Sequence, residues 1–174
     1  MNALDQLQLI FDADGFDFER EHGQFAFRAS CGPFDSFVRI YANGFLLTLI
    51  LETGFCVPED RRSAMAEFCT AANYALMAFA NLEMNPADGQ LILRNAVMMP
   101  AKGSVTDDQL KWFVVSALQI VSNISIPVVE VATRGQDPYV AITKTSDLLS
   151  VTAGSDRQSG MGEGAFSIGR PGQA

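Results

Sequence analysis

The side chain best suited to acid–base chemistry in this sequence is its single histidine, His22. It lies in the polar stretch 20–23, whose composition is typical of a loop between strands. A general base needs a partner that orients it and a pocket that holds the substrate. Nothing near His22 in the sequence offers the geometry of a nucleophile, a base and an orienting group, so we expect an exposed loop histidine.

Three cysteines, Cys31, Cys56 and Cys69, are the candidates for catalysis by a thiol. Their odd number and long spacings argue against a disulfide framework, and no Cys-x-x-Cys pair is present. We expect free, buried thiols in a reducing compartment. A pair formed by Cys31 and His22 is the alternative, and it keeps a thiol-dependent enzyme among the functional hypotheses.

Four acidic residues, Asp12, Asp14, Asp17 and Glu19, lie close together and suggest the start of a calcium loop. An EF-hand loop places glycine at position 6 and a bidentate glutamate at position 12. Here Gly15 falls at position 4, so the spacing does not fit. One histidine and scattered cysteines also cannot supply three or four converging metal ligands. We predict no metal, no cofactor and no catalytic residue.

The composition favours a protein partner over nucleic acid or a membrane. The chain has 174 residues, of which 48% are apolar and thirteen are phenylalanine, and its formal net charge is −8. A negative domain repels phosphate backbones and anionic lipid. The N-terminus does not have the pattern of a secretory signal, and the longest apolar run, Phe45 to Leu51, is too short to span a bilayer. We expect a cytoplasmic protein.

The elements that would position any site follow from periodicity and turn residues. Apolar residues at helical spacing predict a helix over 4–13 that stops at Gly15, and Asn43-Gly44 predicts a tight hairpin turn. The other predicted elements are antiparallel strands near 24–29, 36–42 and 44–53, a helix from Pro58 to about 73–76, and a hairpin whose strands contain Ala78–Met84 and Leu91–Leu93.

The third predicted helix starts near Thr106 and runs to about Asn123, followed by a short helix over 125–133. Its apolar stripe holds Leu110, Phe113, Val114, Ala117, Leu118, Ile120 and Val121. Trp112 and Val115 fall on the opposite, polar face. Either another segment covers them, such as the one after Pro127 or residues 138–149, or they mark a contact with a dimer mate or ligand. Tyr74, on the polar face of the second helix, is a further candidate contact.

The C-terminal residues have a different composition. From about Gly154 the chain is rich in glycine, with few apolar anchors and almost balanced charge. The segment 160–164 superficially resembles a phosphate-binding loop but lacks the lysine of a P-loop. We therefore predict one domain over 1–149 and a flexible, disordered Gly/Ser-rich tail over 150–174.

The order of elements resembles the YbjN-like family of bacterial proteins, which are described as regulators of sensory transduction. That order is helix, three-stranded antiparallel meander, helix, β-hairpin, helix, an α+β fold similar to the acidic chaperones of type III secretion. The residues that carry the resemblance are Ala72-Asn73, Leu82–Met84, Asp88–Arg94, the helix from Thr106, and Ile126-Pro127. It covers about residues 4–133.

The resemblance implies no enzymatic activity, and it implies binding of protein through apolar patches. Our first hypothesis is a non-enzymatic protein-binding or regulatory module that forms a homodimer, with Trp112, Val115 and Tyr74 as candidate contacts. The second is a dedicated acidic secretion-type chaperone that binds an extended client segment. The third is the thiol-dependent enzyme.

Overall fold

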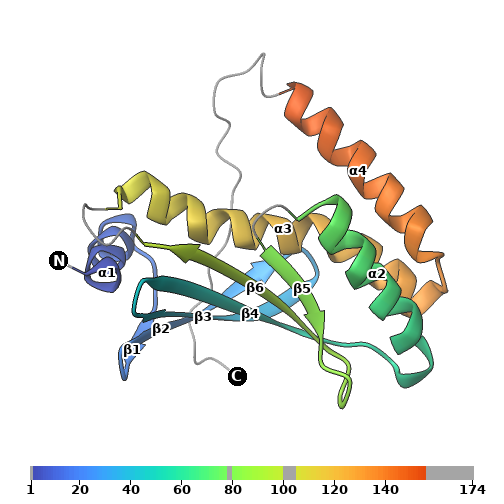
Figure 1. The fold of residues 1–174 in the computed structure, drawn as a ribbon, viewed down its shortest axis with the longest axis horizontal. Coiled ribbons are helices and arrows are strands. Elements are labelled where there is room, and N and C mark those ends of the chain that lie inside the picture. Colours follow the sequence, from blue (N-terminus) through green and yellow to red (C-terminus); the bar gives the residue numbers. More distant parts are fainter. Residues whose placement is uncertain (1, 78–79, 100–104, 156–174) are drawn as a thin grey trace.

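A single antiparallel sheet of six strands organises the chain, in the order β1-β2-β3-β4-β6-β5 (Figure 1). This computed structural model describes residues 2–77, 80–99 and 105–155. The strands are β1 Glu19–Glu21, β2 Gln24–Cys31, β3 Phe34–Asn43, β4 Leu46–Cys56, β5 Ala80–Met84 and β6 Gln90–Met98. The predicted meander is confirmed as β2–β4, and the predicted hairpin, β5–β6, extends the same sheet beyond β4.

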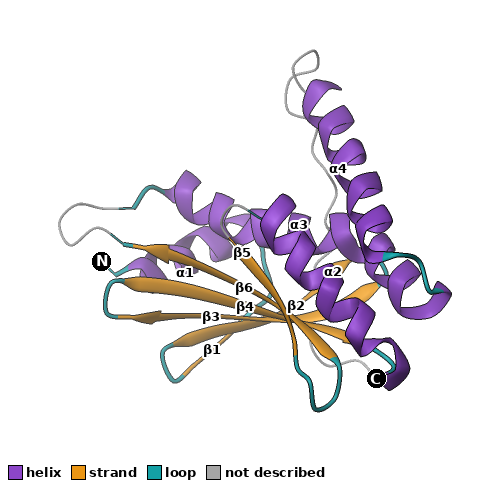
Figure 2. Ribbon diagram, turned by 45° about the vertical axis from the view of Figure 1, so that its right-hand side comes forward, coloured by secondary structure: helices purple, strands orange, loops and turns teal. Residues whose placement is uncertain are grey.

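The described helices all lie on one face of this sheet, and none of them covers the other face (Figure 2). They are α1 Ala3–Asp14, α2 Arg62–Ala75, α3 Asp107–Arg134 and α4 Pro138–Ser155, with a short 3₁₀ turn, η1 Glu59–Arg61, leading into α2. α3 crosses the middle of the sheet, and α4 packs outside it against α2 and α3. The domain is therefore an α+β layer pair, with α4 added to its helical side.

Alternation along the strands places phenylalanine and aliphatic side chains under the helices. In β2, Phe25, Phe27 and Cys31 are buried, while Arg28 between them is exposed. The N-terminal helix adds Phe11, whose ring lies 5.2–5.8 Å from the rings of four other phenylalanines: Phe16, Phe18, Phe25 and Phe27. This aromatic cluster fixes α1 to the sheet, since large apolar side chains dominate core energetics.

The third helix is longer than the sequence predicts. α3 begins with a capping box between Thr106 and Gln109 and continues without a break through Pro127. The prediction of two helices, one ending near Asn123, is wrong. Proline removes one helical hydrogen bond. Here apolar burial continues on both sides of it, at Ile124 and Val128, and holds the helix together.

A second long helix lies where no regular element was predicted. α4 starts at Pro138, and the side chain of Asp137 caps it by accepting hydrogen bonds of 3.0 Å from the backbone N–H groups of Tyr139 and Val140. The helix runs to Ser155, past the predicted boundary at residue 149. The predicted flexible tail otherwise lies outside the described residues.

The side chain of Asn73 joins α2 to the outer edge of the sheet. Its amide NH₂ donates to the Leu82 carbonyl at 3.0 Å, and its oxygen accepts from the Leu82 N–H at 2.7 Å. Leu82 lies on β5, the strand at the edge of the sheet. Asn73 thus acts as a one-residue strand partner, and this gives the Ala72-Asn73 step a structural role.

Replacing Asn73 with aspartate is expected to lower the free energy of unfolding by about 1–3 kcal/mol, because the carboxylate cannot donate and faces the Leu82 carbonyl. Urea denaturation followed by circular dichroism measures the loss. The matched control is Asn81→Asp, which adds the same charge at an exposed position on β5, next to Leu82. Equal losses in both variants would show that a charge near β5, and not the loss of the Asn73 hydrogen bonds, causes the effect.

Candidate partner-binding groove

Two of the three cysteine thiols, those of Cys31 and Cys69, are placed where they make poor nucleophiles. Cys31 and Cys69 are buried, and burial raises the pKa of both thiols, that of Cys69 to about 12. The thiolate is the reactive form, so neither is activated at neutral pH. Cys56 is exposed, which corrects the prediction that all three are buried.

The structure also separates the only candidate Cys–His pair. His22 occupies the tight turn between β1 and β2, where it is exposed and has a positive φ of 49°. Cys31 lies at the far end of β2, eight residues long. At about 3.4 Å per residue the two are on the order of 25 Å apart. A Cys31–His22 pair is therefore excluded.

Of the acidic residues in the predicted cluster, Asp14 is held in a surface ion pair and the other three are exposed. Asp14 lies 2.8 Å from the Lys111 ammonium group, and its carboxylate raises the pKa of Lys111. Asp12, Asp17 and Glu19 are exposed. Across the described residues, no three His, Cys, Asp or Glu side chains gather closely enough to hold a metal ion.

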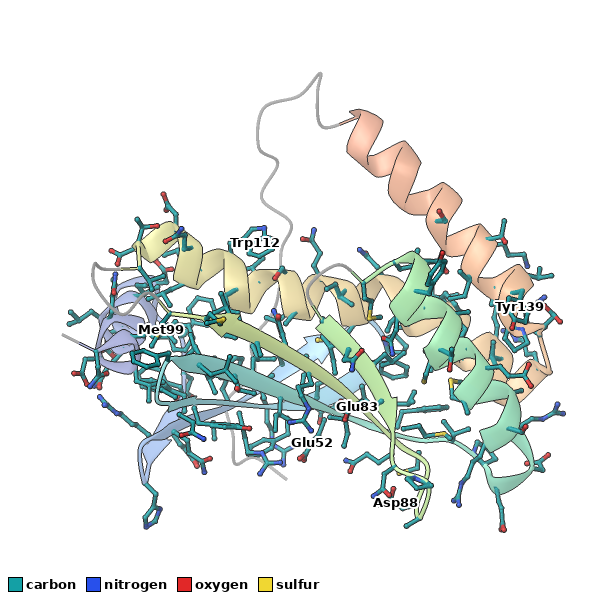
Figure 3. All side chains as sticks on the ribbon, viewed as in Figure 1. Glu52, Glu83, Asp88, Met99, Trp112 and Tyr139 are labelled. Carbon is teal, nitrogen blue, oxygen red and sulfur yellow. The ribbon has the colours of Figure 1, made fainter. Side chains whose placement is uncertain are left out.

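The structure leaves the three predicted contact residues on the surface. Trp112 is 55% exposed, Val115 38% and Tyr74 95%. α4 packs on α2 and α3 without burying Trp112 or Val115, so the alternative that residues 138–149 or the segment after Pro127 covers them is wrong. In Figure 3, Trp112 projects outward from α3.

A groove of about 670 Å³ lies between the last residues of β6 and the first turns of α3. Its size falls within the usual range of small-ligand and side-chain pockets. Its walls are mostly apolar, and Asp108 is the one charged side chain among the described residues that line it. The lining residues are Asn95, Ala96, Val97, Met98, Met99, Val105, Asp108, Gln109, Leu110, Trp112 and Phe113. Of the predicted contacts, Trp112 belongs to this groove, whereas Val115 and Tyr74 do not.

Polar contacts fix the two walls of the groove relative to each other. The side chain of Asn95 on β6 donates to the carbonyl of Phe113 on α3 at 3.3 Å, and Asn95 is buried. On the other side, Gln6 of α1 donates to the Val105 carbonyl at 2.8 Å and to the Asp107 carboxylate at 2.6 Å. The start of α3 is thereby held by both the sheet and α1.

One wall of the groove is the end of β6, beyond its last described pair with β5. The Gln90 carbonyl accepts from Asn85 on the β5 side, whereas the Met99 N–H donates to Phe45 on the β4 side. Even-numbered residues of β6 therefore direct their backbone groups toward β5. The pairing of β5 with β6 ends at Ala80 and Asn95. The backbone N–H and C=O groups of residues 96 and 98 therefore point to the β5 side of β6. Within the described chain, no strand pairs with them there.

The sequence identified Trp112 but missed the strand side of this groove. Val97 and Met98 are exposed apolar residues that continue β6 beyond its last pair with β5. The signal in the sequence is the apolar stretch Ala96–Met99, which lies beyond the predicted return strand at Leu91–Leu93. Its meaning depends on α3 lying beside it, and that contact is tertiary.

The face of the sheet opposite the helices carries charged side chains, whereas the groove is lined mostly by apolar ones. Its long side chains form cross-strand ion pairs, Arg39 with Glu52 and Arg94 with Glu83. Such partly exposed pairs contribute little to stability and keep a face solvated. The apolar groove is therefore the more distinctive candidate for recognition.

Length and composition alone would let α3 cross a membrane, since its most apolar window has a mean hydropathy of 1.7. Core helices of globular domains meet the same criterion. Half of that window is buried inside the domain, and α3 packs on β2, β4 and β6. The apolar residues of α3 are thus largely accounted for by the core.

Comparison with known proteins adds the family. The family model of YbjN, described as "Putative bacterial sensory transduction regulator", matches residues 3–124. The fold is similar to the "Crystal structure of YbjN, a putative transcription regulator from E. coli", with a TM-score of 0.54 and 19% identity over 72% of this chain and 93% of that one. No curated protein sequence matches significantly. Since the family model spans most of the sequence, the chain belongs to the YbjN family.

Proposed function

We propose that this chain is a non-enzymatic, protein-binding module of a regulatory kind. Its groove between β6 and α3 receives apolar side chains of a protein partner. The observation that carries the proposal is an apolar groove of about 670 Å³ beside a half-exposed tryptophan. Tryptophan is enriched where binding energy concentrates, and exposed apolar patches mark interaction sites. The family description as a regulator of sensory transduction supports this reading.

Replacing Trp112 with aspartate is expected to abolish partner binding while the fold is kept, because a charge at the groove removes the apolar contact and adds a desolvation cost. Affinity capture from native lysate, followed by mass spectrometry, compares wild type and variant. The matched control is Tyr139→Asp, which places the same charge on an aromatic side chain that is 62% exposed on α4. A partner retained equally by all three proteins would contradict the assignment to the groove.

We also propose that two copies associate through the outer side of α3. Trp112, Val115 and Ile126 are exposed and fall on one stripe of that helix, and Ile126 is 65% exposed. The same Trp112→Asp variant is then expected to change the species seen by light scattering from dimer to monomer, with an unchanged circular dichroism spectrum. A monomeric wild type, or a variant of unchanged mass, would remove the homodimer.

A second candidate function, a dedicated chaperone for an extended client segment, is favoured by residues 96–98, which within the described chain have no strand partner on their β5 side. An extended segment can add to such an edge through backbone hydrogen bonds, with alternate side chains entering the adjacent pocket. A gene located beside a secretion cluster would favour this candidate over a general regulator.

A further inference from the structure

The C-terminal residues contain a short segment whose pattern matches the groove. Within 156–174, Phe166, Ile168 and Arg170 alternate with the small residues Ser167 and Gly169. Alternation of this kind places two apolar side chains and one cation on the same side of an extended backbone. We propose that residues 165–170 dock on the groove of the same chain, and this inference rests on the proposed function of that groove.

The apolar part of the segment fits the walls that the described residues provide. Trp112, Phe113, Val97 and Met99 present aromatic and flexible apolar surface, and methionine adapts to irregular apolar partners. Two alternate side chains, those of Phe166 and Ile168, would enter this space. The backbone of the segment would then lie along the edge groups of residues 96 and 98, as in strand addition.

The charge of the segment complements that of the groove. Asp108 is the charged residue among the described lining residues, and it lies in the first turn of α3, near the end of β6. Arg170 is the only charged residue in 165–170. A segment that runs in the direction of β6 places Phe166 near Trp112 and Arg170 near Asp108. The docked direction is therefore set by the ion pair.

The length of chain beyond α4 permits docking in the same molecule. The C-terminal end of α4 lies on the helical side of the sheet (Figure 1), the side toward which Trp112 points (Figure 3). Eleven residue steps separate Ser155 from Phe166. These residues can span at most roughly 40 Å, which is more than the length of α4, about 27 Å. A short linker also gives an effective concentration on the order of millimolar, which favours the intramolecular contact.

Docking of the segment makes it a competitor of any partner that uses the groove. A partner must displace residues 165–170, so its apparent affinity equals its intrinsic affinity multiplied by the fraction of molecules whose groove is open. The chain would thus carry its own regulation of the proposed binding site.

The test uses Trp112, the single tryptophan, as a reporter inside the groove. The double substitution Phe166→Ser and Ile168→Ser in the full chain is expected to shift Trp112 emission to longer wavelength and to increase its quenching by acrylamide. A synthetic peptide of residues 163–172 added to this variant should reverse both changes. Met161→Ser removes an apolar side chain from the same tail outside the segment and should change neither.

Charge exchange and dilution complete the experiment. Arg170→Asp should expose Trp112 in part, and Asp108→Arg in the same chain should restore its shielding. Wild-type shielding should persist at concentrations where light scattering shows a monomer, since the contact is intramolecular. Unchanged Trp112 emission in the double variant, or a monomer in which Trp112 is no more shielded than in that variant, overturns the proposal. Partner capture by wild type and its loss in Trp112→Asp test the groove separately, so the two failures are distinguishable.

Discussion

Substituting Phe11 with alanine is expected to lower the free energy of unfolding by about 3–5 kcal/mol, the usual cost of removing a buried phenylalanine. Phe11 is 3% exposed, and its ring contacts four other aromatic rings. The cavity would lie between α1 and the sheet, where surrounding rings cannot easily collapse. Total stabilities of about 5–15 kcal/mol leave little margin for such a loss. Urea denaturation followed by far-ultraviolet circular dichroism measures it.

The matched control is Phe45→Ala, which removes the same side chain from a position that is 63% exposed. Its cost should stay within about 0.5 kcal/mol, as for most surface substitutions. The loss at Phe11 also bears on the groove, because α1 holds the start of α3 through Gln6. A small effect at Phe11, similar to that at Phe45, would mean that α1 contributes little to the fold.

Substituting Gly89 with alanine is expected to cost about 2–5 kcal/mol, from about 1–2 for a left-handed backbone and about 1–3 for overpacking. Gly89 has a φ of 79°, and an added Cβ would lie 2.3 Å from the Val57 carbonyl oxygen. That backbone cannot retreat freely, because the Val57 N–H donates to Gly89 at 2.9 Å. Arg62 adds hydrogen bonds to three carbonyls around the same turn.

Gly44→Ala separates the two contributions to this cost. Gly44 has a φ of 61° but no atom within 4 Å of an added Cβ, so it incurs only the backbone cost of about 1–2 kcal/mol. The difference in urea midpoint between the two variants, at unchanged slope, therefore measures the clash at Gly89. Identical midpoints would contradict the close approach of Gly89 to Val57.

The central elements could be predicted because their signals are local. Asn43-Gly44 and the alternating apolar residues on either side predict the β3–β4 hairpin, and both strands are present. The turn residues are Gly44 and Phe45, one position later than predicted, because Asn43 pairs with Leu46 and only Gly44 has a positive φ. On α2, Met65, Phe68 and Cys69 share one face and are buried, as predicted. Periodicity reports which side of an element is apolar, and in these elements that side is the core.

The missed elements depend on contacts that local patterns do not contain. β1 has only three residues, Glu19–Glu21, with no apolar alternation, and it exists because it pairs with β2. α4 did have a local signal, since Asp137-Pro138 is a favoured start of a helix.

Only one wall of the groove, the one formed by α3, could be predicted from the sequence. Trp112 could be identified because it is an aromatic residue on the polar face of an amphipathic helix, where the apolar period of that helix predicts a polar residue. The facing wall could not be found in this way. Val97 and Met99 come from another element, and they meet α3 through the buried hydrogen bond of Asn95 to Phe113.

The strand order also bears on how this acidic, apolar-rich protein resists aggregation. Six- or seven-residue apolar segments of high β propensity form cross-β assemblies when their edges are free, and Phe45–Leu51 is such a segment. In the fold it belongs mostly to β4, which is paired on both sides by β3 and β6. The outermost strands carry short or clamped edges, the charged β1 and the Asn73-bound β5. Whatever detaches the β5–β6 hairpin therefore exposes an amyloid-prone strand, so the Gly89 turn protects solubility as well as stability.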